Sequence, residues 1–209
     1  VLDMKISELE LSLLDILLPA SKLALDYFEN YKILNRSKKS DSSPVTEADL
    51  ALNDLILKEL KSLTPDVPIL SEELFSEESL KKGQDYFWLI DPLDGTKEFI
   101  NKTGEFTVNI ALVENGVPTL GIVYAPALKR LFYTDSKSSA VEELAPFDES
   151  NVGICKPISV SQPDNSALTV VSSKSHRDAA TDDYIARYQV ADFTSAGSSL
   201  KFCLLATGE

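Results

Sequence analysis

Asp91 and Asp94 stand three residues apart in the segment DPLDGT, residues 91–96. The apolar run 87–90 before them predicts a strand, and the proline and glycine of the segment favour a tight turn at the end of that strand. Two carboxylates on one turn can share a hard cation such as Mg²⁺, which prefers oxygen ligands. The alternative interpretation is a plain polar turn, because each of these residue types favours turns.

A second acidic cluster, Ser71-Glu72-Glu73, follows another short predicted strand at residues 68–71. An isolated pair of glutamates usually marks a solvated surface turn. If the two strands are neighbours in one sheet, however, their ends bring Glu72 close to Asp91. The sequence therefore predicts one metal site built from both acidic clusters.

Asp49 stands three residues after Thr46, at the start of a predicted helix. This Thr-x-x-Asp spacing is typical of helix capping, which requires no catalytic function. Capping is the interpretation that the spacing alone favours, and a catalytic role for Asp49 is the alternative.

The net charge of the 209-residue chain is −13, which disfavours binding to a nucleic-acid polymer. A small phosphate ester is also anionic, so we expect it to bind where metal cations locally reverse the field. His176 is the only histidine, which excludes a histidine-rich zinc site. Neither a P-loop motif nor a dinucleotide-binding glycine motif occurs.

The two cysteines, Cys155 and Cys203, are far apart in the sequence. We expect them to be reduced structural thiols, with a disulfide or redox pair as the alternative. The sequence shows neither a long apolar run nor a secretory leader, so we expect a cytoplasmic protein without a transmembrane segment. Peripheral association with the inner face of the membrane stays open, as does the oligomeric state.

Hydrophobic periodicity predicts a long helix from about Ile6 to Tyr31, which Pro19 is expected to kink or split. Asn115-Gly116 predicts the turn of a hairpin. The other expected elements are helices at about 46–63, at about 178–187 and from 198 onward, and strands at 68–71, 86–91, 106–113, 118–124, 129–134, 158–161, 168–172 and 190–195.

Residues 36–43 are rich in serine and lysine and predict a surface loop. Residues 135–156 show little periodicity, so no structure is assigned to them. The pattern then changes to alternating strands and helices. We therefore expect an N-terminal α+β metal-binding domain at 1–134, with two helices on an antiparallel sheet, and a partial C-terminal α/β domain at 135–209.

Residues 91–96, preceded by 71–73 and by 46–49, resemble in order and spacing the inositol monophosphatase superfamily of lithium-sensitive, Mg²⁺-dependent phosphatases. Four longer strings resemble its branch of CysQ-type 3'(2'),5'-bisphosphate nucleotidases: DPLDGTKEFI at 91–100, GEFTVNIAL at 104–112, GIVYAP at 121–126 and GSSLKFCLL at 197–205. The resemblance implies a layered α-β-α-β-α sandwich of mixed α+β and α/β character. It also implies hydrolysis of adenosine 3',5'-bisphosphate, or of its 5'-phosphosulfate counterpart, in sulfate assimilation.

The same resemblance implies roles for individual residues. Two or more Mg²⁺ ions would bind the Leu93 carbonyl and three carboxylates, those of Glu72, Asp91 and Asp94. Thr96 would hold the attacking water, and Asp49 would pair with Thr96 to accept its proton. Substrate contacts would come from Glu72, Leu93, Asp94, Gly95, Thr96, His176, Ser198 and Lys201. Without the resemblance, a lone histidine such as His176 is more often a structural residue.

The chain departs from the family at its C-terminus, because it stops at Glu209 before the Trp-Asp-x-Ala-Ala-Gly segment that carries the family's remaining metal ligand. We therefore expect an incomplete C-terminal domain, a weakened second metal site, and weakened or absent activity in this fragment. Two alternatives to the nucleotidase stay open: an inositol monophosphatase or sugar bisphosphatase on the same scaffold, and a metal-dependent nucleotide-binding protein without turnover.

Overall fold

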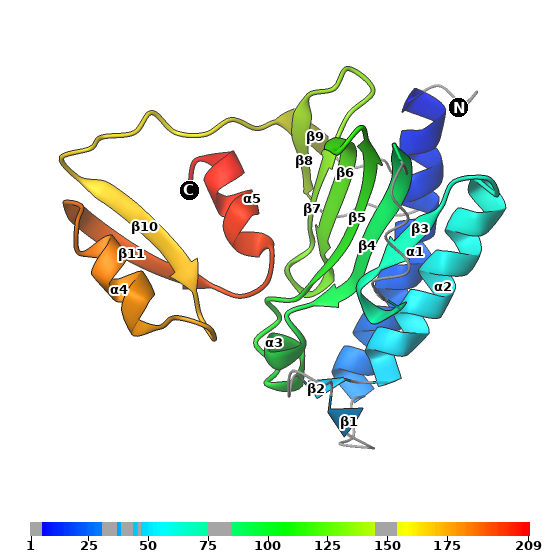
Figure 1. Ribbon diagram of the computed structural model, residues 1–209, viewed down its shortest axis with the longest axis horizontal. Helices are drawn as coiled ribbons and strands as arrows, with labels where there is room; N and C mark the ends of the chain where they lie inside the picture. Colours follow the sequence, from blue (N-terminus) through cyan, green and yellow to red (C-terminus); the bar gives the residue numbers. More distant parts are fainter. Residues whose placement is uncertain (1–5, 31–36, 39–43, 46, 75–84, 145–153) are drawn as a thin grey trace.

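The structure, a computed structural model, describes residues 6–30, 37–38, 44–45, 47–74, 85–144 and 154–209 (Figure 1). Its helices are α1 (Ile6–Asn30), α2 (Glu47–Leu63), α3 (Thr96–Ile100), α4 (Ala179–Ile185) and α5 (Leu200–Thr207), with short 3₁₀ turns at Glu72–Leu74 and Pro126–Leu128. Its strands are β1 (Ser37–Lys38), β2 (Pro44–Val45), β3 (Ile69–Ser71), β4 (Tyr86–Asp94), β5 (Thr107–Glu114), β6 (Val117–Ala125), β7 (Arg130–Thr134), β8 (Ala140–Leu144), β9 (Ile154–Pro157), β10 (Leu168–Ser173) and β11 (Val190–Ala196).

Strands β3 to β9 form one seven-stranded sheet in sequence order. β3 and β4 are parallel, with Ser71 opposite Ile90, and the other neighbours are antiparallel. The carboxyl ends of two adjacent parallel strands lie at the same edge of a sheet. The segments that follow Ser71 and Ile90, which carry the two acidic clusters, therefore start side by side, as the sequence predicted.

Helices α1 and α2 cover one face of this sheet and bury the main hydrophobic core (Figure 1). Leu13, Leu52 and Ile56 from the helices are fully buried, as is Trp88 from β4. The indole of Trp88 donates a 2.9 Å hydrogen bond to Thr64 Oγ1, which satisfies its only polar group inside the core. α1 is continuous across Pro19, so the helix is not split there.

The opposite face of the sheet is covered by α5, which lies between the sheet and the parallel pair β10–β11, with α4 beyond that pair (Figure 1). A second, smaller core joins β6 and β7 to β11 and α5 through Ala125, Phe132, Ala196, Leu200 and Cys203. The layers are thus helices, sheet, helix, sheet and helix. This order confirms the predicted mixed α/β sandwich.

Residues 135–156 carry two strands that the sequence analysis missed, β8 and β9. β8 contains two consecutive buried carboxylates, Glu142 and Glu143, which hide the alternation by which a strand is usually found. The strand predicted at 158–161 was wrong, because β9 ends at Pro157. The sheet therefore crosses residue 135, and the two-domain division stays a prediction.

Two smaller expectations concern the N-terminal third of the chain. Within the predicted loop at 36–43, residues 37–38 form β1, which pairs antiparallel with β2 at 44–45, and the rest of the loop lies outside the described residues. Thr46, the predicted N-cap of the second helix, lies outside the described residues, and the described part of that helix begins at Glu47. In the part of the chain that the structure describes, no helix is both long and apolar enough to cross a membrane.

Candidate active site

The turn at the end of β4 is fixed by its own side chains. The Leu93 amide donates a 3.2 Å hydrogen bond to Asp91 Oδ1, and the Thr96 hydroxyl donates to the Leu93 carbonyl at 3.4 Å. Gly95 has φ +87°, a left-handed conformation that glycine adopts without strain. The turn therefore presents the side chains on both sides of Gly95 to one space.

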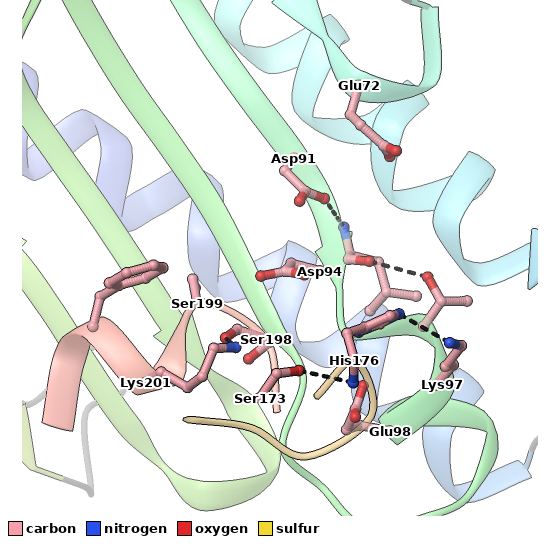
Figure 2. A pocket seen from close by; sticks show the side chains of 14 residues that line it. Glu72, Asp91, Asp94, Lys97, Glu98, Ser173, His176, Ser198, Ser199 and Lys201 are labelled. Atoms are coloured by element: carbon pink, nitrogen blue, oxygen red, sulfur yellow. Dashed lines mark hydrogen bonds between the residues drawn. The ribbon is translucent and has the colours of Figure 1, made fainter. Parts of the chain in front are cut away.

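That space is a cavity of about 430 Å³ between the large sheet and the C-terminal segments (Figure 2). Every predicted site residue except Asp49 lines this cavity. Its lining consists of Glu72, Asp91, Leu93, Asp94, Gly95, Thr96, Lys97, Glu98, Ser173, His176, Ser198, Ser199, Lys201 and Phe202.

Two acids and three basic groups of the lining lie in different parts of the cavity, whereas the acid Glu98 lies beside His176 (Figure 2). Figure 2 shows Glu72 and Asp91 on one side of the cavity, with Lys97, His176 and Lys201 on the other. An anion with two charged groups would meet cations directly only on the second side, so the first side suits an anion only when a metal ion intervenes.

The carboxyl of Asp94 is partly buried and lies near both acidic and basic neighbours. Burial raises the pKa of its carboxyl, and the charge of Glu98 adds in the same direction. Backbone amides of Ser199 and Gly95 and the charge of Lys201 act in the opposite direction. A cation bound at Asp94 would therefore stabilise a carboxylate that burial alone disfavours.

The basic side is organised by hydrogen bonds between distant segments. Lys97 Nζ lies 2.9 Å from His176 Nε2, and the His176 amide donates to Ser173 Oγ at 3.1 Å. The Lys201 ammonium donates to the carbonyl of Ser198, which lies just before α5. These bonds hold the basic groups at the cavity instead of leaving them extended into solvent.

Close contacts join the C-terminal segments to α3 and to the loop after it. Ser175 donates its hydroxyl to the buried carboxylate of Glu98. Lys174 pairs with Glu105 at 3.1 Å, and the Gly197 amide donates to the same carboxylate at 3.3 Å. A side chain at Gly197 would collide with Glu98, because a Cβ there would lie 2.5 Å from Glu98 Cγ.

Ser199 is tied to the neighbouring strand β5. Its hydroxyl donates to Asn109 Oδ1 at 2.8 Å and lies 2.8 Å from Thr107 Oγ1, and Asn109 Nδ2 donates to Thr107 Oγ1 at 3.3 Å. This network fixes the start of α5, and with it the positions of Ser198 and Lys201.

Asp49 is fully buried in the first turn of α2 and is not part of the cavity lining. The structure brings the other predicted residues together, whereas the pairing of Asp49 with Thr96 stays a prediction.

The donor chemistry of the acidic side fits Mg²⁺. Three carboxylates and the Leu93 carbonyl are all oxygen donors, and Mg²⁺ commonly takes only one or two carboxylates from a protein, together with water and substrate phosphate. Among the described residues, no three acidic, histidine or cysteine side chains are grouped closely enough to hold an ion by themselves. Water and substrate oxygens would complete the coordination.

Five lining residues were not predicted: Lys97, Glu98, Ser173, Ser199 and Phe202. Four of them, Lys97, Glu98, Ser199 and Phe202, lie inside the strings 91–100 and 197–205 that carry the family resemblance. Their position next to predicted site residues is the signal by which the sequence could have identified them. The contact between Lys97 and His176 had no such signal, because these residues are far apart in the chain.

Comparison with known proteins gives consistent results. The sequence model of the Inositol monophosphatase family matches residues 11–209. The 3'(2'),5'-bisphosphate nucleotidase CysQ of Salmonella typhimurium is 43% identical over 190 residues, which are 91% of this chain and 73% of that protein. The protein of the same name from Escherichia coli K12 is 42% identical over the same shares. A crystal structure of CysQ from Bacteroides thetaiotaomicron, described as a bacterial member of the inositol monophosphatase family, superposes with a TM-score of 0.77 at 32% identity, covering 97% of this chain and 77% of that one.

Proposed function

The chain belongs to the inositol monophosphatase family, and we propose that it acts as a Mg²⁺-dependent 3'(2'),5'-bisphosphate nucleotidase. It would hydrolyse adenosine 3',5'-bisphosphate to AMP and phosphate, or the corresponding 5'-phosphosulfate to its adenylyl sulfate. Relatives that carry this name are 40–43% identical to the chain over about nine tenths of its length. The family is metal-dependent, typically on Mg²⁺.

The observation that carries the proposal is the composition of the cavity described above. Glu72, directly after β3, and Asp91, near the end of β4, lie on one side, and the basic groups of Lys97, His176 and Lys201 lie on the other. A substrate with one phosphate to be cleaved and a second anionic group to be held matches this division. An inositol monophosphate offers only one such group.

The acidic side would bind two or more Mg²⁺ ions through the Leu93 carbonyl and the carboxylates of Glu72, Asp91 and Asp94. When bound, Mg²⁺ supplies Lewis-acid stabilisation of phosphoryl oxygens and lowers the pKa of a coordinated water.

The residues of the turn would then position the reacting groups. The Gly95 and Thr96 amides would donate to oxygens of the phosphate that is cleaved. The Thr96 hydroxyl would orient the attacking water in line with the phosphorus, and Asp49 would accept a proton through Thr96. Because charge spreads over the phosphoryl oxygens in the transition state, such positioning and charge stabilisation contribute most of the rate enhancement.

The second side would hold the nucleotide. Ser198 and Lys201 at the start of α5 and His176 after β10 come from segments that are linked to the turn by the contacts at Glu98 and Glu105. The nucleotide would therefore be bound by the same rigid arrangement that presents the acidic turn.

Phosphate release is the direct test. The chain is assayed with adenosine 3',5'-bisphosphate and with inositol 1-phosphate, each with Mg²⁺ and with EDTA. We expect Mg²⁺-dependent release from the nucleotide at a low rate, in line with the weakened second metal site expected from the sequence. Release only from the inositol ester would assign the chain to the inositol phosphatases. Binding of the nucleotide without release from either ester would contradict enzymatic turnover and favour a binding protein.

A further inference from the structure

Lys97 is the cationic residue of the cavity lining that has no role in the function proposed above. It lies directly after Thr96 in α3, lines the cavity, and reaches across to His176 on the opposite chain segment (Figure 2). The two residues are separated by 79 positions in the sequence, and their nitrogens are 2.9 Å apart.

The donor roles in this contact follow from the chemistry of the two groups. A lysine ammonium has three N–H donors and no acceptor, so His176 Nε2 must accept, and the ring hydrogen then lies on Nδ1. The bond to His176 uses one of the three donors. An anion that enters the cavity can therefore bind Lys97 while the contact with His176 remains.

Although Lys97 directly follows Thr96, its ammonium lies beside His176 and not beside the carboxylates. The carboxylates of Glu72 and Asp91 lie on the other side of the cavity from the pair Lys97–His176 (Figure 2). In a chain of net charge −13, Lys97 and Lys201 are the two ammonium groups in the lining. The charge of Lys201 acts on the carboxylate of Asp94 and opposes the rise in its pKa, so this ammonium is already partly compensated by an acid of the metal-binding turn.

A bisphosphate nucleotide carries two anionic groups, and the metal-binding side can neutralise the one that is hydrolysed. The other needs a cation that belongs to the protein, because a desolvated phosphate without a partner is costly to bury. We infer that Lys97, positioned by His176, binds the phosphate that is not cleaved, and this inference rests on the proposed function. It thereby sets the preference for bisphosphate over monophosphate nucleotides.

The test replaces Lys97 by methionine and compares two substrates that differ only in the phosphate at issue. Adenosine 3',5'-bisphosphate carries the 5'-phosphate, and adenosine 3'-monophosphate does not. We expect Lys97→Met to raise the KM for the bisphosphate about 10-fold to 100-fold, which corresponds to the loss of a hydrogen bond to a charged group. The kcat/KM for the monophosphate should stay within about twofold of the wild-type value. Lys97→Arg, which keeps the charge, should restore most of the preference.

Two controls separate this effect from a change in fold or in net charge. Thermal unfolding of Lys97→Met should be close to that of the wild type. Lys58→Met removes the same charge from a lysine of α2 that is 83% exposed and outside the cavity, and should change neither KM.

Each outcome decides the inference. If Lys97→Met lowers kcat/KM equally for both substrates, Lys97 acts on the reacting phosphate and the inference is overturned. An unchanged KM for the bisphosphate in Lys97→Met would also overturn it. So would a wild-type protein that shows no preference for the bisphosphate over the monophosphate. If the wild type releases phosphate from neither nucleotide, the proposed function fails. Calorimetric binding of the same two nucleotides to wild type and Lys97→Met then decides the Lys97 subsite by the same comparison.

Discussion

Gly95 and Ser198 meet so closely that a Cβ on Gly95 would lie 3.0 Å from the Cβ of Ser198. It would also lie 3.0 Å from the Glu105 carbonyl. This contact brings the turn after β4 against the start of α5, although the two residues are far apart in the sequence. The absence of a side chain at Gly95 is therefore what allows the two walls of the cavity to approach each other.

Gly95→Ala should abolish most phosphate release and destabilise the fold. The substitution meets two penalties, a left-handed backbone with φ +87° and a collision with the opposite wall. Gly116→Ala is the matched control, because Gly116 has φ +77° with open space around it. We expect Gly116→Ala to cost about 1–2 kcal/mol of stability by urea unfolding with normal activity. Equal activity in both variants would show that the close approach is dispensable.

Asp91→Asn should remove Mg²⁺-dependent phosphate release while the protein stays folded. The amide is nearly isosteric and can still accept the hydrogen bond from the Leu93 amide, but it carries no charge for a hard cation. The comparison is Asp66→Asn, at an exposed position outside the cavity, which should keep normal activity. Phosphate release titrated with Mg²⁺ is the measurement, and near-normal turnover by Asp91→Asn would refute the proposed metal site.

Arg130→Met should cost about 3 kcal/mol of stability in urea unfolding. Arg130 Nε donates to Glu142 Oε1 at 2.6 Å, and the Glu142 side chain is only 1% exposed, so the substitution leaves this buried carboxylate with only the exposed Lys156 ammonium, 3.5 Å away, as a cationic partner. Adding Glu142→Gln should recover part of the loss, because the buried charge is then removed. Arg177→Met breaks the exposed pair with Asp182 and should cost less than about 1 kcal/mol. Similar losses in both single variants would argue against this account.

The two thiols should differ strongly in reactivity. Both are free; Cys155 is exposed, whereas Cys203 is packed in the second core. Burial raises the pKa of Cys203 to about 12, so at pH 8 almost none of it is the reactive thiolate. We expect iodoacetamide to modify Cys155 in the native protein and Cys203 only after denaturation, as read by peptide mass spectrometry.

The same shift in pKa gives a dependence of stability on pH. In the unfolded chain the Cys203 thiol ionises near its ordinary pKa of 9, whereas in the folded chain it stays protonated to higher pH. Its contribution to the free energy of unfolding is therefore fully present below pH 9 and is lost as pH rises toward 12. Cys203→Ala should flatten this part of the profile of unfolding free energy against pH. A profile unchanged above pH 9 would contradict the assignment.

The fold was predictable where local pattern and tertiary environment agree. The hairpin was found from Asn115-Gly116, and both residues have the positive φ that such a turn requires. Strand β8 was missed because its buried acids are stabilised by partners elsewhere in the fold, such as Arg130 for Glu142. Pairing partners of that kind cannot be read from spacing within the strand.

The candidate site was predictable on its acidic side, because short motifs at the ends of β3 and β4 carry all three carboxylates. Its basic side depended on the family resemblance, and the contact between Lys97 and His176 came from the structure alone. Such a contact is decided by how β10 and α5 dock on α3, and that docking depends on small residues such as Gly95 and Gly197 that carry no chemistry of their own.

One wall of the cavity comes from Glu72 and residues 91–98, and the other comes from residues 173–202. This division affects the dynamics of the protein as well as its chemistry. A nucleotide bound between the walls contacts both, so it acts as a reversible bridge that stabilises the closed arrangement in proportion to its occupancy. Opening of β10, β11 and α5 away from the large sheet becomes rarer as ligand concentration rises. Backbone amides of these three elements should then exchange their hydrogens with solvent more slowly, while those of α1 and α2 keep the rates of the ligand-free protein.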